Sequence, residues 1–557
     1  MAKMEDLYNT PAEKLDAFVD HVLQPNKEWK DEVKDVFKRI ADFFQNQCFQ
    51  DYIIRDKQVK VIKVVKGGSF SKGTGIKNVS DVDVLLFLSC FSSFEDQYRL
   101  RNEIIEFMRE KLKKCQESIA YDIVTVPKQE TLFRPPRSLN FDVQSKKRTK
   151  LIHVDVLPVY NALEEENPLS LYQTLRQENC PEVVQALSVW QNPQSTVYEK
   201  LIKSRRCPGE FAPSFSELQR NFVKHRPTKL KSFLRLVKYW YREYVKKKYS
   251  GKHIPPKYAL ELLTIYVWEI GKPNTNDFSL AEGFVTLMNL VKDYRNICIY
   301  WTVYYDFENQ AVGHFLKRQL RYIPQTKEKK RPIILDPADP TNKVGNGYNW
   351  DLIAKEASYC LSQACSQLKD RMPISSWNVK GARNICVTVI CPGLRTWEYC
   401  LNPYDPIQKI KKEIEKVEKI PIADQRLSFK EPKRKRQVLM GHSNLAEYDI
   451  FYKIKIEVLV ISSARHHIHV KFPDNTCQTY PLERRDTVLM VKQQIEEQGK
   501  HPVKNQILRF QDQFLRQRKT LRYFDIQDGD TLELKLSTAS KRGKLKTRKE
   551  KVVLARV

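Results

Sequence analysis

Two aspartates spaced two positions apart, Asp81 and Asp83, follow a glycine-rich turn and open an apolar run. The turn lies at 67–75, the apolar run at 84–88, and another apolar run, 59–65, precedes the turn. In a β-strand this spacing places both carboxylates on one face. Adjacent like charges repel, so the pair needs a compensating cation, and a divalent metal with oxygen ligands is the natural one. The pattern fits nucleotidyl transfer.

A third carboxylate, Asp155, stands alone inside the apolar run 151–157. Burying it is costly unless it has a partner, and the plain interpretation is that an arginine or backbone N–H groups satisfy it. The earlier pair of aspartates favours a second interpretation. An antiparallel neighbouring strand would bring Asp155 beside Asp81 and Asp83, and the three carboxylates would form a cage for two Mg²⁺ ions.

Residues 217–248 form a strongly basic stretch. Eleven Lys and Arg residues stand there against Glu217 and Glu243, which gives a local net charge of +9. An apolar stripe at helical period predicts a helix that packs on one side and is cationic on the other, and Arg220 and Lys224 share a face. A solvated helix face is the plain alternative, but the near absence of acidic residues argues against it.

The whole chain is also basic. Its 557 residues suggest roughly three to four domains. The 96 Lys and Arg residues against 67 Asp and Glu residues give a net charge of +29, which favours a polyanionic partner. No apolar run approaches the length of a membrane span, and the first residues lack the apolar core of a signal peptide. The twelve cysteines, without a CxxC pair, indicate reduced intracellular thiols.

Apolar spacing predicts the elements that position these residues. Strands are expected at 59–65, 82–88, 139–143 and 151–157, and helices at 95–114, 258–270 and 350–368. Residues 371–383 look like a linker. Beyond it, a hairpin, a helix and further strands occur in the same order twice, about eighty residues apart, which indicates an internal duplication.

Several strings carry a family resemblance. Gly68-Ser69 with Asp81, Asp83 and Asp155 resemble the nucleotidyltransferase superfamily that includes poly(A) polymerases. Longer strings over residues 1 to about 370 resemble the 2′-5′-oligoadenylate synthetases: Arg226-Pro227-Thr228-Lys229-Leu230-Lys231, Tyr258-Ala259-Leu260-Glu261-Leu262-Leu263 and Ile334-Leu335-Asp336-Pro337-Ala338-Asp339-Pro340-Thr341. The two C-terminal repeats are similar to ubiquitin, as at Gln425-Arg426-Leu427 and Thr520-Leu521. The layout resembles family members with two C-terminal ubiquitin-like domains.

The resemblance implies an α+β fold with a bilobal, poly(A)-polymerase-like nucleotidyltransferase body followed by two β-grasp ubiquitin-like domains. The expected parts are a catalytic lobe at 1–210, a helical lobe at 211–370, the linker 371–383, ubiquitin-like domains at 384–461 and 466–537, and a basic tail at 538–557.

The implied activity is synthesis of 2′-5′-linked oligoadenylates from ATP, activated by double-stranded RNA, with release of pyrophosphate, in interferon-induced antiviral innate immunity. Two Mg²⁺ ions are expected. The resemblance assigns catalysis and metal binding to Asp81, Asp83 and Asp155. It assigns ATP binding to Gly68, Ser69, Lys72, Lys238 and Tyr258, and RNA binding to Lys66, Arg220, Lys224, Thr228 and Lys229.

The chain departs from the family pattern at several positions. Lys257 stands where synthetases often carry glutamine. The apolar patch by which ubiquitin is recognised is replaced by Ser428 in the first repeat and by Arg509 and Lys535 in the second, so ordinary ubiquitin receptors are not expected to bind. The sequence does not close on Gly-Gly, so conjugation to other proteins is not expected.

Alternatives remain open at this point. The main one is a non-enzymatic adaptor that binds RNA and signals through protein partners of its ubiquitin-like domains. A more remote one is a cyclic-dinucleotide or 3′-5′ polymerase, because the three aspartates do not select the linkage. Metal binding by His466, His467 and His469 is disfavoured because no cysteine cluster accompanies them. The expected location is the cytoplasm, with the nucleus as an additional site.

Overall fold

The computed structural model describes residues 6–537 with internal gaps, and the basic tail 538–557 lies outside the described residues. The gaps are 80, 115–120, 126–135, 145–150, 164–194, 274, 322–330, 371, 392, 394, 432–434, 461–465, 483–485 and 500. The chain divides into two compact units, Met1–Arg383 and Asn384–Val557. Among the described residues, no helix has the length and apolarity needed to cross a bilayer.

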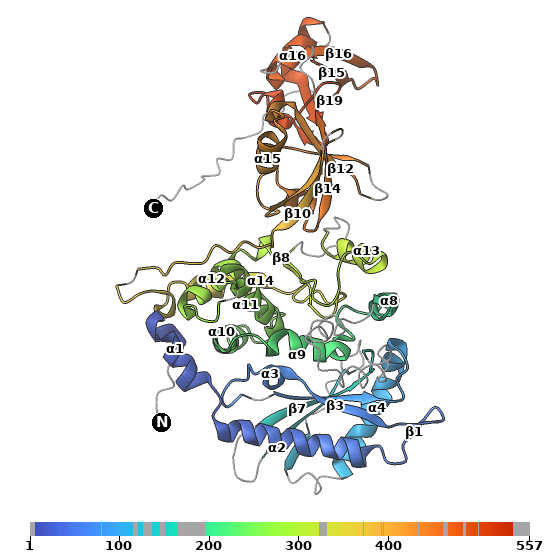
Figure 1. Cartoon of the computed structure of the whole chain (residues 1–557), viewed down its shortest axis with the longest axis vertical. Coiled ribbons are helices and arrows are strands. Elements are labelled where there is room, and N and C mark those ends of the chain that lie inside the picture. Colours follow the sequence, from blue (N-terminus) through green and yellow to red (C-terminus); the bar gives the residue numbers. More distant parts are fainter. Residues whose placement is uncertain are drawn as a thin grey trace, which may run out of the picture. The chain divides into compact units, whose positions relative to one another are not determined.

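A five-stranded sheet in the order β3-β4-β7-β6-β5 supports one end of the first unit (Figure 1). Its strands are β3 (Val61–Lys66), β4 (Asp81–Leu88), β5 (Asp122–Thr125), β6 (Leu139–Gln144) and β7 (Leu151–Val159). Strand β4 is antiparallel to β3 and parallel to β7, while β6 is antiparallel to both β5 and β7.

The parallel pairing of β4 and β7 corrects the antiparallel neighbour expected for Asp155. Helix α4 (Phe94–Lys114) reverses the chain after β4, and the antiparallel steps from β5 to β6 and β7 then bring β7 into the direction of β4. The expected proximity survives the correction, because Asp83 and Asp155 are register partners.

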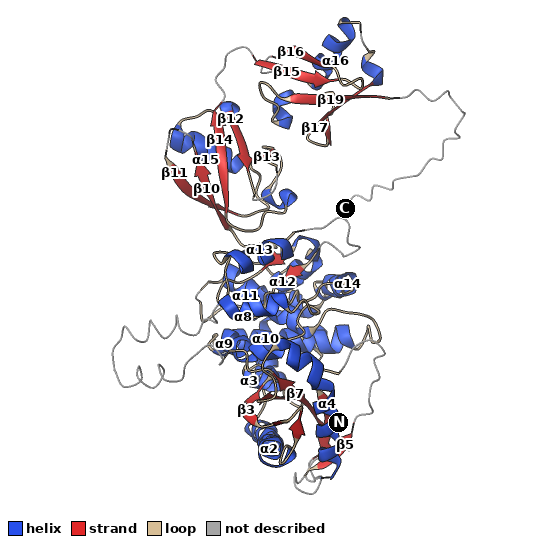
Figure 2. Cartoon of the chain, turned by 90° about the vertical axis from the view of Figure 1, so that its right-hand side faces the viewer, coloured by secondary structure: helices blue, strands red, loops and turns tan. Residues whose placement is uncertain are grey.

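Two long helices pack on this sheet, α4 and α2 (Lys27–Phe43) (Figure 2). Asn26 begins α2 by accepting a hydrogen bond from the Trp29 N–H at 3.0 Å, as an N-cap should. Val33, Val36 and Ile40 recur at helical spacing and are fully buried. Helix α2 therefore covers the sheet that carries the aspartates.

Helices make up most of the rest of the first unit. They are α1 (Leu15–Phe18), α3 (Gly68–Ser71), α8 (Ser195–Lys203), α9 (Ser216–Lys224), α10 (Thr228–Trp240), α11 (Lys257–Gly271), α12 (Leu280–Lys292), α13 (Gln310–Gln319) and α14 (Trp350–Cys360). Short strands β1 (Ile53–Ile54) and β2 (Lys57–Gln58) pair with each other, and so do β8 (Cys298–Ile299) and β9 (Ile333–Ile334). Helix α11, expected at 258–270, is buried from Ala259 to Trp268 because it packs against α10 and α12, and it forms part of the core.

The segment expected to be a linker, 371–383, packs on these helices instead. The Trp377 side chain lies against Gly271 and Gly283, where a Cβ atom would come within 2.4 and 2.9 Å of the indole. Its main-chain N–H donates to Thr286 Oγ1 and its Nε1 donates to Glu282 Oε2, both at 2.8 Å. The close packing of the Trp377 indole and its two hydrogen bonds therefore attach this stretch to the first unit.

The second unit contains two sheets of identical topology, which confirms the duplication. Their orders are β11-β10-β14-β12-β13 and β16-β15-β19-β17-β18. The first repeat contains β10 (Ile385–Ile390), β11 (Thr396–Leu401), α15 (Gln408–Glu418), β12 (Gln425–Phe429), β13 (Gln437–Leu439) and β14 (Ile454–Val460). The second contains β15 (His466–Lys471), β16 (Cys477–Leu482), α16 (Val488–Glu497), β17 (Gln506–Phe510), β18 (Gln513–Phe514) and β19 (Thr531–Leu536).

One pair of cysteines departs from the expected reduced state. Cys386 and Cys400 are register partners on β10 and β11 and form a disulfide, with Cα atoms 4.2 Å apart. The sequence hides this pair, because its members are fourteen residues apart and only the hairpin register brings them together.

A buried ion pair joins the two repeats. Lys411 Nζ lies 2.6 and 2.7 Å from the two carboxylate oxygens of Asp525, and the two side chains are 3% and 6% exposed. Arg426 and Asp530 form a second pair between the repeats. Gly441 borders the first pair, with its added Cβ 3.9 Å from Asp525 Oδ2. Lys411 also donates to the main-chain oxygen of Gln425 at 2.9 Å, and the equivalent lysine of the second repeat, Lys492, donates in the same way to Gln506 at 2.6 Å.

We expect Lys411→Met to destabilise the second unit by about 3 kcal/mol, because it leaves the buried Asp525 carboxylate unpaired. Lys492→Met is the matched control. It removes the same hydrogen bond from lysine to main chain but no ion pair, so its effect should be smaller, about 1 kcal/mol. Hydrogen exchange of peptides from 384–537, measured on the full chain in urea, checks both variants. Equal effects of the two substitutions would contradict the importance of the ion pair.

Candidate active site

The three aspartates lie together at one end of the β4–β7 pair. Asp83 pairs in register with Asp155, and Asp81 with His153. Val82 and Val154 alternate with them and are buried on the opposite face. Strand alternation therefore sends the acidic side chains to one face while the valines form the core.

Charge repulsion is visible in this arrangement. Burial and the neighbouring Asp155 carboxylate raise the pKa of Asp83 to about 6, and burial also raises the pKa of Asp155. Asp81 differs, because although burial opposes ionisation, the ammonium of Lys257 holds its pKa below the usual range. Lys257 Nζ lies 2.7 Å from Asp81 Oδ2.

The expected three-carboxylate cage is not closed. Within the part of the chain that the structure describes, no group of three or more His, Cys, Asp or Glu side chains is arranged to hold a metal ion. The reason is that the carboxylates have other partners: Asp81 binds Lys257, and Asp155 Oδ1 lies 3.4 Å from His153 Nε2. The donor set still fits a divalent ion chemically, since Asp83 and Asp155 are adjacent oxygen donors that destabilise each other's charge.

Behind the carboxylates, the glycine-rich turn approaches β4 closely. The Gly67 N–H donates to the Asp83 main-chain oxygen at 2.8 Å. Gly68 has φ +66, and a Cβ there would lie 1.8 Å from Asp83 Oδ2. A side chain at this position would displace the carboxylate, so only glycine allows both the backbone conformation and the approach.

A buried charge cluster links the turn to the helical lobe. Glu261 on α11 accepts from Lys72 at 2.7 Å and from Lys238 at 2.8 Å. Lys238 Nζ also donates to Thr74 Oγ1 at 2.7 Å. Although burial opposes ionisation, the two lysines lower the pKa of Glu261 to about 2. This carboxylate is therefore charged at every ordinary pH and orients both lysines.

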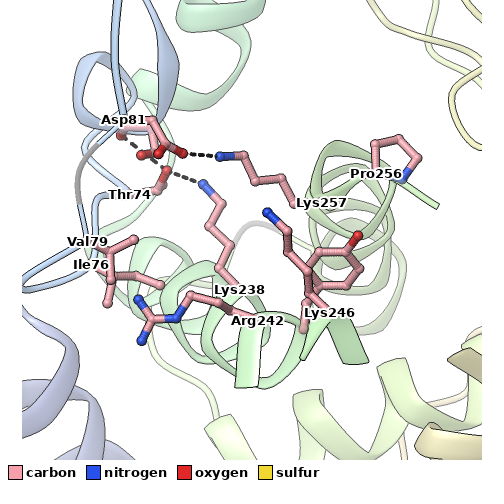
Figure 3. A pocket seen from close by; sticks show the side chains of 11 residues that line it. Thr74, Ile76, Val79, Asp81, Lys238, Arg242, Lys246, Pro256 and Lys257 are labelled. Atoms are coloured by element: carbon pink, nitrogen blue, oxygen red, sulfur yellow. Dashed lines mark hydrogen bonds and ion pairs between the residues drawn. The ribbon is translucent and has the colours of Figure 1, made fainter. Parts of the chain in front are cut away.

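A cavity of about 400 Å³ opens beside this cluster, as Figure 3 shows. Of the residues assigned to ATP or metal from the sequence, Ser69, Asp81 and Lys238 line it. Arg242, Lys246 and Lys257 bring three further cations. The cavity is thus a small pocket with four cationic side chains and a carboxylate on its wall, which suits a polyanion with an accompanying cation.

The remaining residues assigned to ATP lie next to this pocket and not on its lining. Gly68 supports Asp83, as described. Lys72 is held by Glu261, and its Nζ lies 4.7 Å from the centre of the Tyr258 ring. One face of the Tyr258 ring is therefore occupied by a lysine.

The residues assigned to RNA occur on α9, α10 and β3. Lys224 and Thr228 are exposed, at the end of α9 and the start of α10. Arg220 is partly buried, Lys229 pairs with Asp16, and Lys66 packs its ammonium 5.5 and 5.7 Å from the Phe37 and Phe70 rings.

Helix α10 connects this basic face with the catalytic turn. Its Arg235 donates to the main-chain oxygens of Gly75 and Gly73, at 3.0 and 2.7 Å. Lys238, one turn further along the helix, holds Thr74. The same helix thus carries Lys229 near its start and binds the glycine-rich turn through Arg235 and Lys238 further along.

Sequence reasoning missed several residues of the site. Arg242 and Lys246 follow Lys238 at intervals of four, a signal that predicts one helical face and was available in the basic stretch. His153 Nδ1 lies 2.7 Å from Asp142 Oδ1, and its Nε2 faces Asp155, so a series of side-chain contacts runs from Asp142 through His153 to the site. Only the β6–β7 register, which pairs Asp142 with His153, reveals it.

Comparison with known protein families gives three matches. Residues 191–382 match the model described as 2'-5'-oligoadenylate synthetase 1, domain 2, C-terminus. Residues 52–134 match the nucleotidyltransferase domain, and residues 468–539 match the ubiquitin family. These matches confirm the expected fold classes of the catalytic body and of the second repeat.

Whole proteins of similar sequence are also known. The chain is 44% identical to 2'-5'-oligoadenylate synthase-like protein 2 of Mus musculus, with 96% of this chain and 99% of that protein covered. It is 39% identical to 2'-5'-oligoadenylate synthase-like protein 1 of the same species, covering 97% and 98%. It is 40% identical to 2'-5'-oligoadenylate synthase 1A of Rattus norvegicus, covering 67% of this chain and 96% of that protein.

We expect divalent-ion binding to weaken below pH 6. Asp83, whose pKa is raised to about 6, takes up a proton there, and a protonated carboxyl is a poor ligand. Mn²⁺ affinity should fall by up to about tenfold per pH unit between pH 6 and pH 5. Calorimetric titration of the full chain with Mn²⁺ at pH 5 to 8 measures this. A flat profile would contradict the prediction, and Asp83→Asn should bind weakly throughout.

Proposed function

Because the chain belongs to the family of 2′-5′-oligoadenylate synthases and synthase-like proteins, we propose that it is a 2′-5′-oligoadenylate synthetase activated by double-stranded RNA. It carries a nucleotidyltransferase domain. The observation that supports activity most strongly is the set Asp81, Asp83 and Asp155, intact and clustered on two adjacent strands beside a cationic pocket.

The charge and the hydroxyl groups of the pocket support the proposal that it holds a donor ATP. Lys238, Arg242, Lys246 and Lys257 offset the charge of a triphosphate, and Ser69 and Thr74 offer hydroxyl groups. Glu261 keeps Lys238 in place by a 2.8 Å ion pair. A preorganised cation of this kind stabilises negative charge that develops on the departing pyrophosphate.

The proposed reaction needs a base next to the acceptor. The 2′-oxygen of the acceptor adenylate bonds to the α-phosphorus of the donor, the bond from that phosphorus to the β-phosphate oxygen breaks, and pyrophosphate leaves with the electron pair. The hydroxyl proton passes to Asp155, which His153 orients at 3.4 Å. Mg²⁺ held by Asp81, Asp83 and Asp155 would supply charge stabilisation when bound.

Duplex RNA is the proposed activator, and α9 and α10 are its proposed docking face. Lys224 and Thr228 are exposed there, and Arg235 on the same helix α10 grips the turn that supports Asp83. RNA held by phosphate contacts at the start of α10 would therefore bias the conformation of the catalytic turn.

The second candidate is an RNA-binding antiviral adaptor that acts through its ubiquitin-like repeats. It is favoured by one observation, the buried Lys411–Asp525 pair, which makes the repeats a single compact unit suited to presenting a composite surface. The position of Ser428, buried and hydrogen-bonded by Arg436, agrees with an altered ubiquitin patch.

Synthesis is tested by incubating the full chain with ATP and Mg²⁺, with and without duplex RNA, and identifying product linkage by linkage-specific nucleases. We expect 2′-5′ oligoadenylates only with RNA, and a loss of at least about 100-fold in Asp83→Asn, because a site for charge stabilisation is removed. If the wild type makes no product with RNA, synthesis is rejected and the adaptor function remains. If the products are 3′-5′-linked or cyclic, the proposed 2′-5′ linkage is wrong.

The RNA face is tested by Arg220→Gln with Lys224→Gln. Loss of two phosphate contacts should lower the dependence of log affinity on log salt by about 2 and reduce RNA-stimulated synthesis at least about tenfold. Lys113→Gln with Lys114→Gln, at the end of α4, removes the same charge elsewhere and serves as the control. RNA binding and stimulation that fall equally in both pairs would contradict a specific docking face.

A further inference from the structure

We propose that Lys257 is a built-in counter-cation of the carboxylate site, which occupies Asp81 until a divalent ion displaces it and then turns to the phosphates of the nucleotide. The inference rests on the metal and ATP sites of the proposed function. Lys257 thereby acts as a positioning residue that couples the binding of the divalent ion to the binding of the nucleotide.

The contact itself crosses the catalytic body. Lys257 Nζ lies 2.7 Å from Asp81 Oδ2, although the two residues are 176 positions apart in the sequence. One belongs to helix α11 and the other to strand β4, and Figure 3 shows the bond spanning the pocket wall. The ammonium thus holds an oxygen that a metal ion bound by all three aspartates would need.

The position of Lys257 at the start of a helix favours an ion pair between its ammonium and a carboxylate from another element. Lys257 is the first residue of α11, after Pro256, and the first helical turn contains no acidic residue. Unpaired N–H groups give a helix a positive N-terminal end, where a lysine is disfavoured and an anion is favoured. A carboxylate from another element offsets this local excess of positive charge, and Asp81 provides it.

The contact is also easy to exchange. The Lys257 and Asp81 side chains are 57% and 40% exposed, so water screens the pair and competes with it. The buried pair of Lys238 with Glu261 differs sharply, with side chains 9% and 5% exposed. Of the two lysines, Lys238 is fixed by its partner, whereas Lys257 is held loosely enough for a divalent cation to replace it.

A released Lys257 remains on the pocket wall, where Lys238, Arg242 and Lys246 also lie. Binding of the metal ion alone therefore breaks the ion pair between Lys257 and Asp81 and gives Lys257 no new anionic partner. Binding of a metal–triphosphate complex supplies the lysine with new anionic partners. The metal and the nucleotide should accordingly bind with positive coupling through this one side chain.

Two measurements on the full chain test the role. In Lys257→Gln, Mn²⁺ measured alone by calorimetry should bind about threefold to fivefold more tightly than in the wild type, the range that an exposed ion pair allows. A non-hydrolysable ATP analogue with Mg²⁺ should bind about threefold to fivefold more weakly, because a phosphate contact is lost. Lys257→Arg keeps the charge and should stay near the wild type in both.

Lys246→Gln is the matched control, because it removes one positive charge from the same pocket without removing the bond to Asp81. If Lys257→Gln and Lys246→Gln change Mn²⁺ affinity equally, the effect is only the general field of the pocket and the proposal fails. It also fails if Lys257→Gln weakens Mn²⁺ binding or if no variant binds Mn²⁺ at millimolar concentration. These titrations need no turnover, so opposite shifts for Mn²⁺ and nucleotide would support Lys257's role even in a protein that makes no oligoadenylate.

Discussion

Mutual repulsion of the carboxylates on β4 and β7 is the constraint around which the first unit is built. Register places Asp83 beside Asp155, and burial together with this repulsion raises the pKa of Asp83. A sheet alone has no way to relieve this charge. The relief comes from the helices, since α11 brings Lys257 to Asp81 and the Lys72–Lys238–Glu261 cluster ties the glycine turn to α10 and α11. The same ion pairs therefore hold the helices against the sheet and orient the charged groups of the site.

The catalytic pattern was largely predictable, because its information is local. Spacing of two along a strand places Asp81 and Asp83 on one face, and the glycine at position 68 reports an approach to Asp83 that a Cβ atom would block. The strand direction was not predictable, since α4 and the β5–β6 hairpin decide it. Nor were the partners of each charge: Lys257 lies 176 residues from Asp81, and a sequence gives no measure of that distance in space.

Apolar and cysteine patterns misled for a related reason. Residues 371–383 show no helical or strand period and resemble a linker, yet one large side chain, Trp377, fills the space left by two glycines on α11 and α12. Cys386 and Cys400 became partners only through the register of a hairpin. Each of these contacts depends on two segments that are separate in the sequence. The sequence of one segment alone therefore does not predict the contact.

The Lys411–Asp525 pair also bears on how the second unit can be inherited and edited. Ubiquitin-like domains are usually thought of as interchangeable parts, each complete in itself. Here the first repeat buries an ammonium whose counter-charge is encoded more than a hundred residues later, in the second. A chain that ended between the repeats would lose both the carboxylate and the surface that cover the Lys411 ammonium. The interface is therefore encoded in both halves of the duplication, because each half contributes one partner to both of the ion pairs that join them.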